Sequence, residues 1–140
     1  MTTAAEVFEA LKYYIVDTAN GTRRYYTLEN KLHREDGPAV IWKDGCLEWW
    51  INGLRHREDG PAIVYSDGSE EWFHTGERHR LDGPAYIHTN GKKEWWQNGK
   101  PHRANGPAVE WDGNKRWFLH GVEYTEHQHR RQLKQLGIAV

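Results

Sequence analysis

The sequence predicts a mainly β protein, a single-layer antiparallel meander of tandem β-hairpin repeats with short terminal helices. The repeat length is about 23 residues, and three motifs recur at this interval. His-Arg pairs begin at His33, His56, His79 and His102. Gly-Pro-Ala triplets begin at Gly37, Gly60, Gly83 and Gly106. Aromatic pairs follow as Trp49-Trp50, Trp72-Phe73, Trp95-Trp96 and Trp117-Phe118.

Two turn dipeptides divide each repeat. The first is Asp44-Gly45, Asp67-Gly68, Asn90-Gly91 or Asp112-Gly113, and the second is Asn52-Gly53, Thr75-Gly76, Asn98-Gly99 or His120-Gly121. Such dipeptides between apolar runs favour tight hairpins, because the turns that match the twist of paired strands need positive φ. Two turns per repeat predict two strands, one through Ala39 to Trp42 and one through Leu47 to Ile51, with equivalents in the other repeats.

Two irregularities fall where a meander tolerates them. The residue that matches Lys43, Ser66 and Thr89 is missing just after Trp111, beside a turn, where its loss need not reverse the facing of the strand. The prolines at 38, 61, 84 and 107 cannot donate to a ladder, so each Gly-Pro predicts a bulge or a break where a strand joins the sheet.

We expect one domain over residues 1–140, with caps at both ends of the array. Residues 1–29 form an N-terminal helix and a degenerate repeat, in which Asn30-Lys31 replaces the second turn; residues 30–124 form four repeats; residues 125–140 form a capping helix. The helical pattern of Thr3 to Leu11 runs through Val7, Phe8 and Leu11.

The C-terminal helix is predicted from about Glu126 to Leu136. Thr125 and Gln128 have capping-box spacing, and Gly137 is the stop. Leu133 and Leu136 are expected to cover the last strand.

Composition argues against several classes of protein. The chain has 19 Lys and Arg against 20 Asp and Glu, so a general attraction to nucleic acid or an anionic membrane is not expected. The only cysteine, Cys46, cannot form an internal disulfide, and no leader pattern or membrane-spanning run is visible. A cytoplasmic protein that does not insert into membranes is the expectation.

The titratable residues recur with the repeat, which argues against an enzyme. Equivalent histidines lie two strands apart, about 9.6 Å, too far to share one metal ion. We therefore expect structural histidines in the repeats, hydrogen bonded to Asp36, Asp59 and Asp82, and solvated His127 and His129. The repeated glutamates are interpreted as the polar residues of one position on the second strands; they are Glu48, Glu71 and Glu94. Cys46 is interpreted as a passive thiol. No catalytic residue, metal or cofactor is predicted.

Columns of rings and guanidinium groups remain as the candidate binding site. By strand parity the first ring of each aromatic pair lies on one face and the second on the other. A basic stripe of repeated arginines runs beside them, and Trp and Arg are frequent anchors of protein interfaces. The predicted binding residues are Trp49, Trp50, Trp72, Trp95, Trp96, Trp117, Arg34, Arg57, Arg80 and Arg103.

The repeat core, Asn-Gly-x-x-His-Arg-x-Asp-Gly-Pro-Ala followed by Gly and Trp-aromatic, resembles the variant form of the MORN repeat. The resemblance covers about residues 30–124. The repeats are similar to the type that occurs in uncharacterised phage and bacterial repeat proteins. It implies a twisted antiparallel sheet used for recognition, and it implies no reaction.

Two functions remain open. The first is a non-catalytic protein-binding scaffold, of the kind that a phage uses to inhibit a host defence factor or a toxin. The alternative is a small-ligand binder, such as a nucleotide or signalling-nucleotide sponge, in which Trp rings stack on the base and Arg contacts the phosphate. A weaker third possibility is single-stranded nucleic acid following the same groove.

Overall fold

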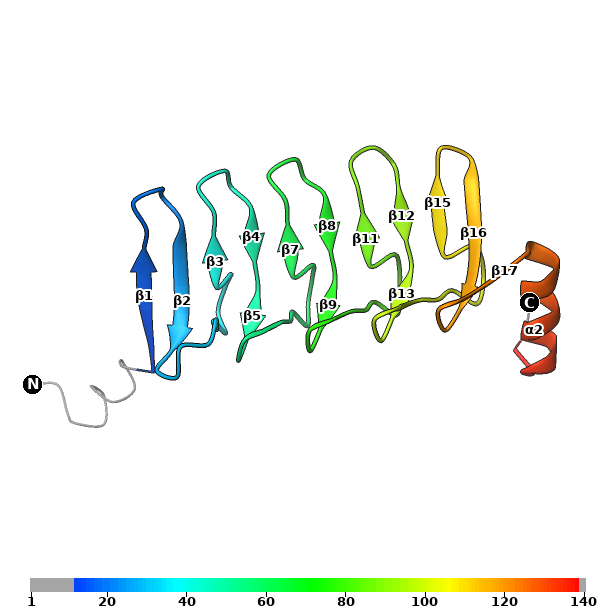
Figure 1. The fold of residues 1–140 in the computed structure, drawn as a ribbon, viewed down its shortest axis with the longest axis horizontal. Coiled ribbons are helices and arrows are strands. Elements are labelled where there is room, and N and C mark those ends of the chain that lie inside the picture. Colours follow the sequence, from blue (N-terminus) through cyan, green and yellow to red (C-terminus); the bar gives the residue numbers. More distant parts are fainter. Residues whose placement is uncertain (1–11, 139–140) are drawn as a thin grey trace, which may run out of the picture.

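A computed structural model describes residues 12–138. Its longest sheet has eleven strands in the order β1-β2-β3-β4-β7-β8-β11-β12-β15-β16-β17, with antiparallel pairing throughout. The predicted mainly β meander of hairpin repeats is therefore confirmed, and Figure 1 shows the hairpins following one another along the molecule. The strands of this sheet are β1 (Tyr13–Asp17), β2 (Arg23–Thr27), β3 (Val40–Ile41), β4 (Leu47–Glu48), β7 (Ile63–Val64), β8 (Glu70–Glu71), β11 (Tyr86–Ile87), β12 (Lys93–Glu94), β15 (Val109–Trp111), β16 (Asn114–Leu119) and β17 (Val122–Tyr124).

Three further hairpins lie along the lower border in Figure 1. They are β5 (Trp50–Ile51) with β6 (Leu54–Arg55), β9 (Phe73–His74) with β10 (Glu77–Arg78), and β13 (Trp96–Gln97) with β14 (Lys100–Pro101). The strand predicted from Leu47 to Ile51 is thus two segments, because the chain changes partners at Trp49. The Trp49 N–H donates to Ala62 O of the next unit, whereas its carbonyl accepts from His56 N. Only in the last repeat does one strand, β16, run unbroken.

The two turns of a repeat have different geometry. In the second turn both residues have positive φ, for example 48° at Asn52 and 80° at Gly53, which is the two-residue hairpin turn that the dipeptide predicts. In the first turn only the glycine has positive φ, for example 93° at Gly45, because this loop has three residues. The missing residue after Trp111 converts the fourth of these loops to the two-residue form, with φ 49° at Asp112.

This deletion leaves the facing of the strands unchanged, as predicted. Glu110 pairs with Lys115 in the fourth repeat, at the positions where Ile41 pairs with Leu47 in the first.

The core is a narrow ribbon where each proline leads into the sheet. The alanines that follow the prolines are completely buried, and Val40 and Ile63 beside them are 2% and 4% exposed. Each alanine N–H donates to a carbonyl of the neighbouring strand, at 2.8 Å for Ala39 to Glu48 O. The alanines are Ala39, Ala62, Ala85 and Ala108.

The N-terminal end of the sheet is an open edge in the described residues. Every residue of β1 is exposed, and β1 pairs only with β2. The turn after β2 is a three-residue loop from Leu28 to Asn30, and Asn30 has a φ angle of 65°. The predicted turn, Asn30-Lys31, therefore extends one residue beyond the end of the observed loop. The predicted helix from Thr3 to Leu11 lies outside the described residues.

The C-terminal helix, α2 (Glu126–Gln135), begins as predicted. Thr125 and Gln128 form the reciprocal capping box, and Gly137 ends the helix with φ 70°. Leu133 is 1% exposed and belongs to the core, but Leu136 is 60% exposed, so the prediction that it covers the last strand is wrong. Across residues 12–138 no helix is both long and apolar enough to cross a membrane.

Candidate binding surface

The repeated histidines hold the second turns in place. In each repeat the Nδ1 atom accepts the N–H of the first turn residue, at 3.0 Å from Asn52 to His33 and 2.9 Å from Thr75 to His56. His79 and His102 bind Asn98 and His120 in the same way, each at 3.0 Å. The predicted structural role agrees with these bonds. The predicted aspartate partners are wrong, because those carboxylates bind arginines.

Each repeated arginine is held by contacts on several sides, and its side chain is 21% to 25% exposed. The guanidinium of Arg57 lies 3.9 Å from the centroid of the Trp49 ring, its Nε donates to Asp59 at 3.3 Å, and its Nη1 donates to Pro61 O at 3.1 Å. On its other side lies Gly60, where an added Cβ would come within 2.9 Å of Cζ. The same arrangement recurs for Arg34 on Tyr25, Arg80 on Trp72 and Arg103 on Trp95, at 4.2, 4.0 and 3.7 Å.

A second set of stacks surrounds the ladder glutamates on the opposite face. Glu48, 8% exposed, accepts hydrogen bonds from the indole N–H groups of Trp42 and Trp50, each at 2.8 Å, and Arg55 lies 4.8 Å from the Trp50 ring. The next repeat replaces Trp42 by Tyr65. Burial first, and then the hydrogen bond of this phenol to its glutamate, raise the pKa of Tyr65.

The last repeat exchanges the two charges of this network. The first two repeats have glutamate on the ladder and arginine on the lower hairpin, and the third keeps Glu94 but has Pro101 in place of the arginine. The last has Arg116 and Glu123, joined by two hydrogen bonds of 2.9 Å. Both side chains are about half exposed, at 56% and 48%. The ion pair is therefore retained at a position that is more exposed to solvent.

The predicted binding residues thus belong to two separate networks, one on each face. Trp49, Trp72 and Trp95 stack with the repeated arginines, whereas Trp50 and Trp96 bind the ladder glutamates. Trp117 lies 5.2 Å from the ring of His129.

His129 was predicted to be solvated, and this is wrong. It is 2% exposed, and its Nε2 is 2.8 Å from Arg103 O. His127 is exposed, as expected. The most exposed tryptophan is Trp111, at 46%, which sequence reasoning did not select.

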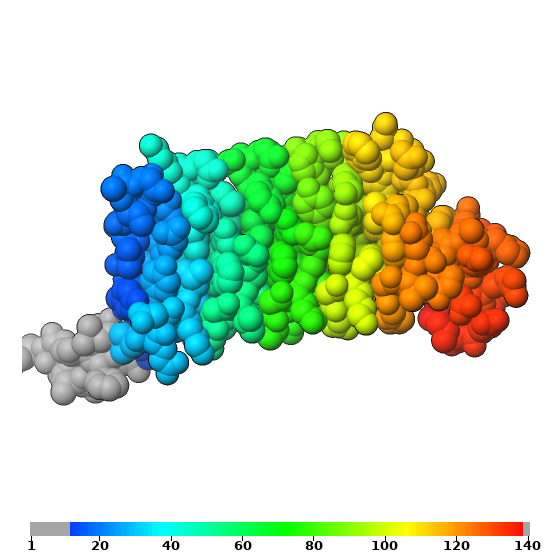
Figure 2. Space-filling model, in the orientation of Figure 1, coloured from blue at the N-terminus to red at the C-terminus, as the bar shows by residue number. Residues whose placement is uncertain are grey.

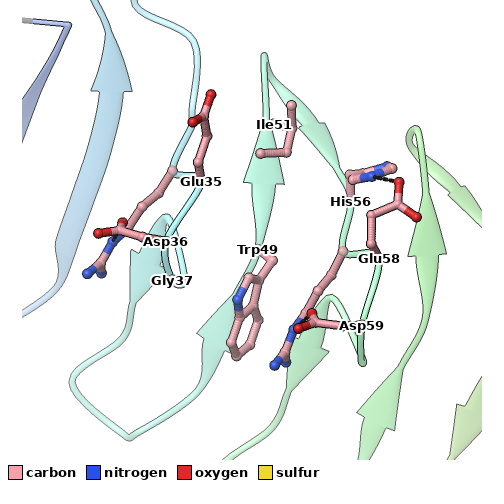
Figure 3. A pocket seen from close by; sticks show the side chains of 10 residues that line it. Glu35, Asp36, Gly37, Trp49, Ile51, His56, Glu58 and Asp59 are labelled. Atoms are coloured by element: carbon pink, nitrogen blue, oxygen red, sulfur yellow. Dashed lines mark hydrogen bonds and ion pairs between the residues drawn. The ribbon is translucent and has the colours of Figure 1, made fainter. Parts of the chain in front are cut away.

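Three equivalent grooves follow one another on the face of the repeated arginines. Groove 1 lies between the His-Arg-x-Asp loops of the first two repeats and holds about 680 Å³; groove 2 and groove 3, one and two repeats further on, hold about 660 and 490 Å³. Figure 3 shows Trp49 lying between the two loops of groove 1, with Glu35 and Glu58 projecting from its walls. The floors of the grooves are Trp49, Trp72 and Trp95.

The charge of the grooves changes along the row. Groove 1 is lined by four carboxylates, Glu35, Asp36, Glu58 and Asp59, against two arginines. Groove 2 also has four carboxylates and two arginines, whereas groove 3 has one carboxylate, Asp82, and two arginines.

One cluster at the wall between groove 1 and groove 2 has the composition of a metal site. His56, Glu58 and His74 each bring a ligand atom within 4.8 Å of the others. However, His56 Nδ1 accepts the Thr75 N–H, so the neutral ring carries its proton on Nε2, which lies 2.8 Å from Glu58 Oε1. A metal ion on Nε2 would require the other tautomer and would cost the turn its hydrogen bond. The geometry therefore favours a histidine–glutamate hydrogen bond over coordination.

The cysteine shows no sign of activation. Cys46 is buried beside Glu48, and burial first, with the nearby carboxylates, raises the pKa of its thiol. A thiol in this environment is a poor nucleophile at neutral pH.

A scan against models of known protein families finds no match to the chain, and a search of curated proteins finds none either. The resemblance to the variant MORN repeat therefore stays a prediction that depends on the repeated motif.

Proposed function

We propose that this chain is a non-catalytic, protein-binding repeat scaffold of the variant MORN type, which binds its partner along the row of three grooves. The observation that carries the proposal is that the repeats, which lie side by side along the molecule (Figure 2), form three equivalent, open grooves in a row with walls of loop residues. A row of this kind offers a long contact to an extended partner, which is the common use of repeat proteins.

The structural roles of the titratable groups support the proposal that the protein is non-catalytic. The repeated histidines hold turns, the ladder glutamates accept indole and guanidinium donors, and the repeated arginines are enclosed by rings, glycines and carbonyls. A nucleophile and a base would need one asymmetric arrangement, but these groups recur with the repeat.

The nucleotide alternative draws less support from the same contacts. A sponge needs a free ring face and a free guanidinium beside it. In the three central stacks the guanidinium already lies against one face of the indole and donates to a proline carbonyl, so it is not free to contact a phosphate. The carboxylates of grooves 1 and 2 would also repel a phosphate.

The test is capture of protein partners by matched charge variants. The variant Glu35→Lys with Glu58→Lys reverses the charge on two exposed groove walls. The turn variant, Glu29→Lys with Glu77→Lys, makes the same change at two exposed residues outside the grooves, in the loop after β2 and at the start of β10. Melting curves should show that both variants fold. A stoichiometric partner held by the wild type and by the turn variant, but lost by the groove variant, is the expected result.

Equal capture by all three proteins, or capture of nothing above background, would contradict the proposal. The expectation that the partner is a host defence factor or a toxin stays a prediction, which the identity of the captured protein would decide.

A further inference from the structure

The grooves have a fixed spacing along the sheet. Each repeat adds two strands to the ladder, so equivalent points of neighbouring grooves lie about 9.6 Å apart. Neighbouring grooves also share a wall, because the loop of Arg57, Glu58 and Asp59 lines both groove 1 and groove 2. The loop of Arg80 to Asp82 does the same for groove 2 and groove 3. A bound chain can therefore pass from one groove to the next without leaving the surface.

Only one regular peptide conformation matches this spacing. A polyproline II helix rises about 3.1 Å per residue with three residues per turn, so it presents every third side chain on the same side at about 9.3 Å. A β-strand covers the distance in about three residues too, but its side chains alternate, and every third one faces away. An α-helix returns to the same side only after about seven residues, at about 10.5 Å, which exceeds the groove spacing by about 0.9 Å at each repeat.

The walls of the first two grooves favour positive charge on that peptide. The side chains of Glu35, Asp36, Glu58 and Asp59 are between 75% and 88% exposed. Asp36 and Asp59 are neutralised by the arginines that they bind. Glu35 and Glu58 have only histidine neighbours, so their charges face the solvent above the grooves.

The same wall position becomes apolar further along the array. It is occupied by Leu81 in the third repeat and by Ala104 in the fourth, and Asn105 replaces the aspartate. The row is thus acidic at its N-terminal end and slightly basic at its C-terminal end, which gives a bound peptide a preferred direction.

We propose that the row of grooves binds a cationic segment in polyproline II conformation, with a basic side chain at every third residue over grooves 1 and 2 and an uncharged residue over groove 3. This inference rests on the proposed protein-binding function and names the chemistry of the partner. Proline rings pack on the indole floors, as they do in aromatic grooves generally, and the basic side chains pair with Glu35 and Glu58.

Two features of the surface reduce the cost of binding. The loops that form the walls are held by the histidine bonds to the turns and by the arginine bonds to proline carbonyls. A polyproline II peptide is itself stiff before it binds, so neither side loses much conformational freedom.

The experiment measures binding of labelled synthetic peptides to the whole chain by fluorescence anisotropy. The probe has two Arg-Pro-Pro triplets followed by one Ala-Pro-Pro triplet. One control peptide has the same composition with its arginines at irregular spacing, and another has Glu-Pro-Pro triplets. We expect saturable binding of the probe, binding of the irregular peptide weaker by about tenfold, and none of the acidic one.

The variants from the capture test provide matched controls. Reversal at Glu35 and Glu58 should weaken binding of the probe by about tenfold, since two ion pairs become repulsions, whereas reversal at Glu29 and Glu77 should leave binding unchanged. Indole N–H resonances of Trp49 and Trp72 should shift on titration and that of Trp111 should not.

Equal binding of the regular and irregular peptides would overturn the spacing argument, and so would indifference to the groove variant. If the wild type bound a nucleic acid oligomer more tightly than it binds the probe, the row would be a site for polyanions instead. Failure of every peptide together with success of the capture test would reject this partner chemistry while the proposed function stands.

Discussion

Replacement of Gly60 by alanine should disrupt an arginine stack without changing the backbone. The φ angle of Gly60 is outside the positive region, so alanine fits the chain there. Its Cβ would nevertheless lie 2.9 Å from Cζ of Arg57. Because the clash is with the end of a flexible side chain, we expect the guanidinium to leave its place between Trp49 and Gly60.

The cost follows from the contacts that the guanidinium gives up. A partly buried cation–π contact contributes about 0.5–2 kcal/mol. The charge-assisted hydrogen bond to Pro61 O contributes about 1.5–3 kcal/mol, and the exposed pair with Asp59 at most about 1 kcal/mol. The displaced group regains part of this in water, and alanine returns about 0.4–1 kcal/mol by restricting the unfolded chain. We expect Gly60→Ala to lower the free energy of unfolding by about 2 kcal/mol.

A double-mutant cycle isolates the stack from other effects of the methyl group. Urea unfolding, followed by far-UV circular dichroism, gives the free energies of the wild type, Gly60→Ala, Arg57→Ala and the double variant. Once Arg57 is truncated there is nothing to displace, so Gly60→Ala should become neutral or stabilising, and the coupling energy should be about 2–3 kcal/mol.

The control variant is Gly45→Ala, which has φ 93° and no atom within 4 Å of the added Cβ. It should cost about 1 kcal/mol through backbone strain alone, and its effect should add to that of Arg57→Ala. If Gly60→Ala is equally costly with and without Arg57, the glycine is not there to admit the guanidinium, and the reasoning fails.

Three further predictions concern the turns, the ion pairs and pH. Thr75 is β-branched and has a φ angle of 48°, so its backbone is strained. Thr75→Asn should therefore stabilise the protein by about 1 kcal/mol, and Asn98→Thr should destabilise it by a similar amount, both measured by urea unfolding. Changes of the opposite sign would contradict the argument from strain. Arg78→Ala should lower the free energy of unfolding by about 3 kcal/mol, because it leaves the buried carboxylate of Glu71 without its ion-pair partner. Arg116→Ala, which breaks a half-exposed pair, should lower it by less than about 1 kcal/mol. Equal losses would show that burial does not decide the strength of these pairs. Burial first, then neighbouring histidines, lower the pKa of His102, so the unfolded chain binds the extra proton. Stability should be complete above about pH 6.5 and fall as the pH drops below that value, and His102→Asn, whose amide oxygen can accept the same N–H, should flatten this profile.

The fold could be predicted from the sequence because its determinants are local and repeated. A turn dipeptide sets its own φ angles, and recurrence at a fixed interval turns one hairpin into an array. The expected facing after the deletion at Trp111 also held, because the lost residue came from a loop. The break of the second strand at Trp49 could not be seen, since it depends on which neighbouring strand accepts each N–H.

The partners of the histidines and arginines were harder to predict because they depend on folding across the repeat. The sequence led to Asp36 as the partner of His33, but His33 Nδ1 accepts the N–H of Asn52, 19 residues on, and its Nε2 lies 3.5 Å from Glu35. A signal was nonetheless present: glycine stands three residues after arginine in every copy, which a simple turn does not require. The exchange of charges at Arg116 and Glu123 is a second such signal. The signal for the burial of His129 is its spacing, since it lies four residues before Leu133 and therefore on the same face of the helix.

The structure also changes which residues are expected to decide the partner. The tryptophans and arginines that the sequence marks out are the same in every central repeat because they build the stacks, so they cannot by themselves distinguish one groove from another. The residue between arginine and aspartate is free of those contacts and varies, from Glu35 and Glu58 to Leu81 and Ala104. Because that position forms the exposed wall of each groove, partner choice is expected to depend on it, while the repeated columns supply a rigid frame of constant spacing.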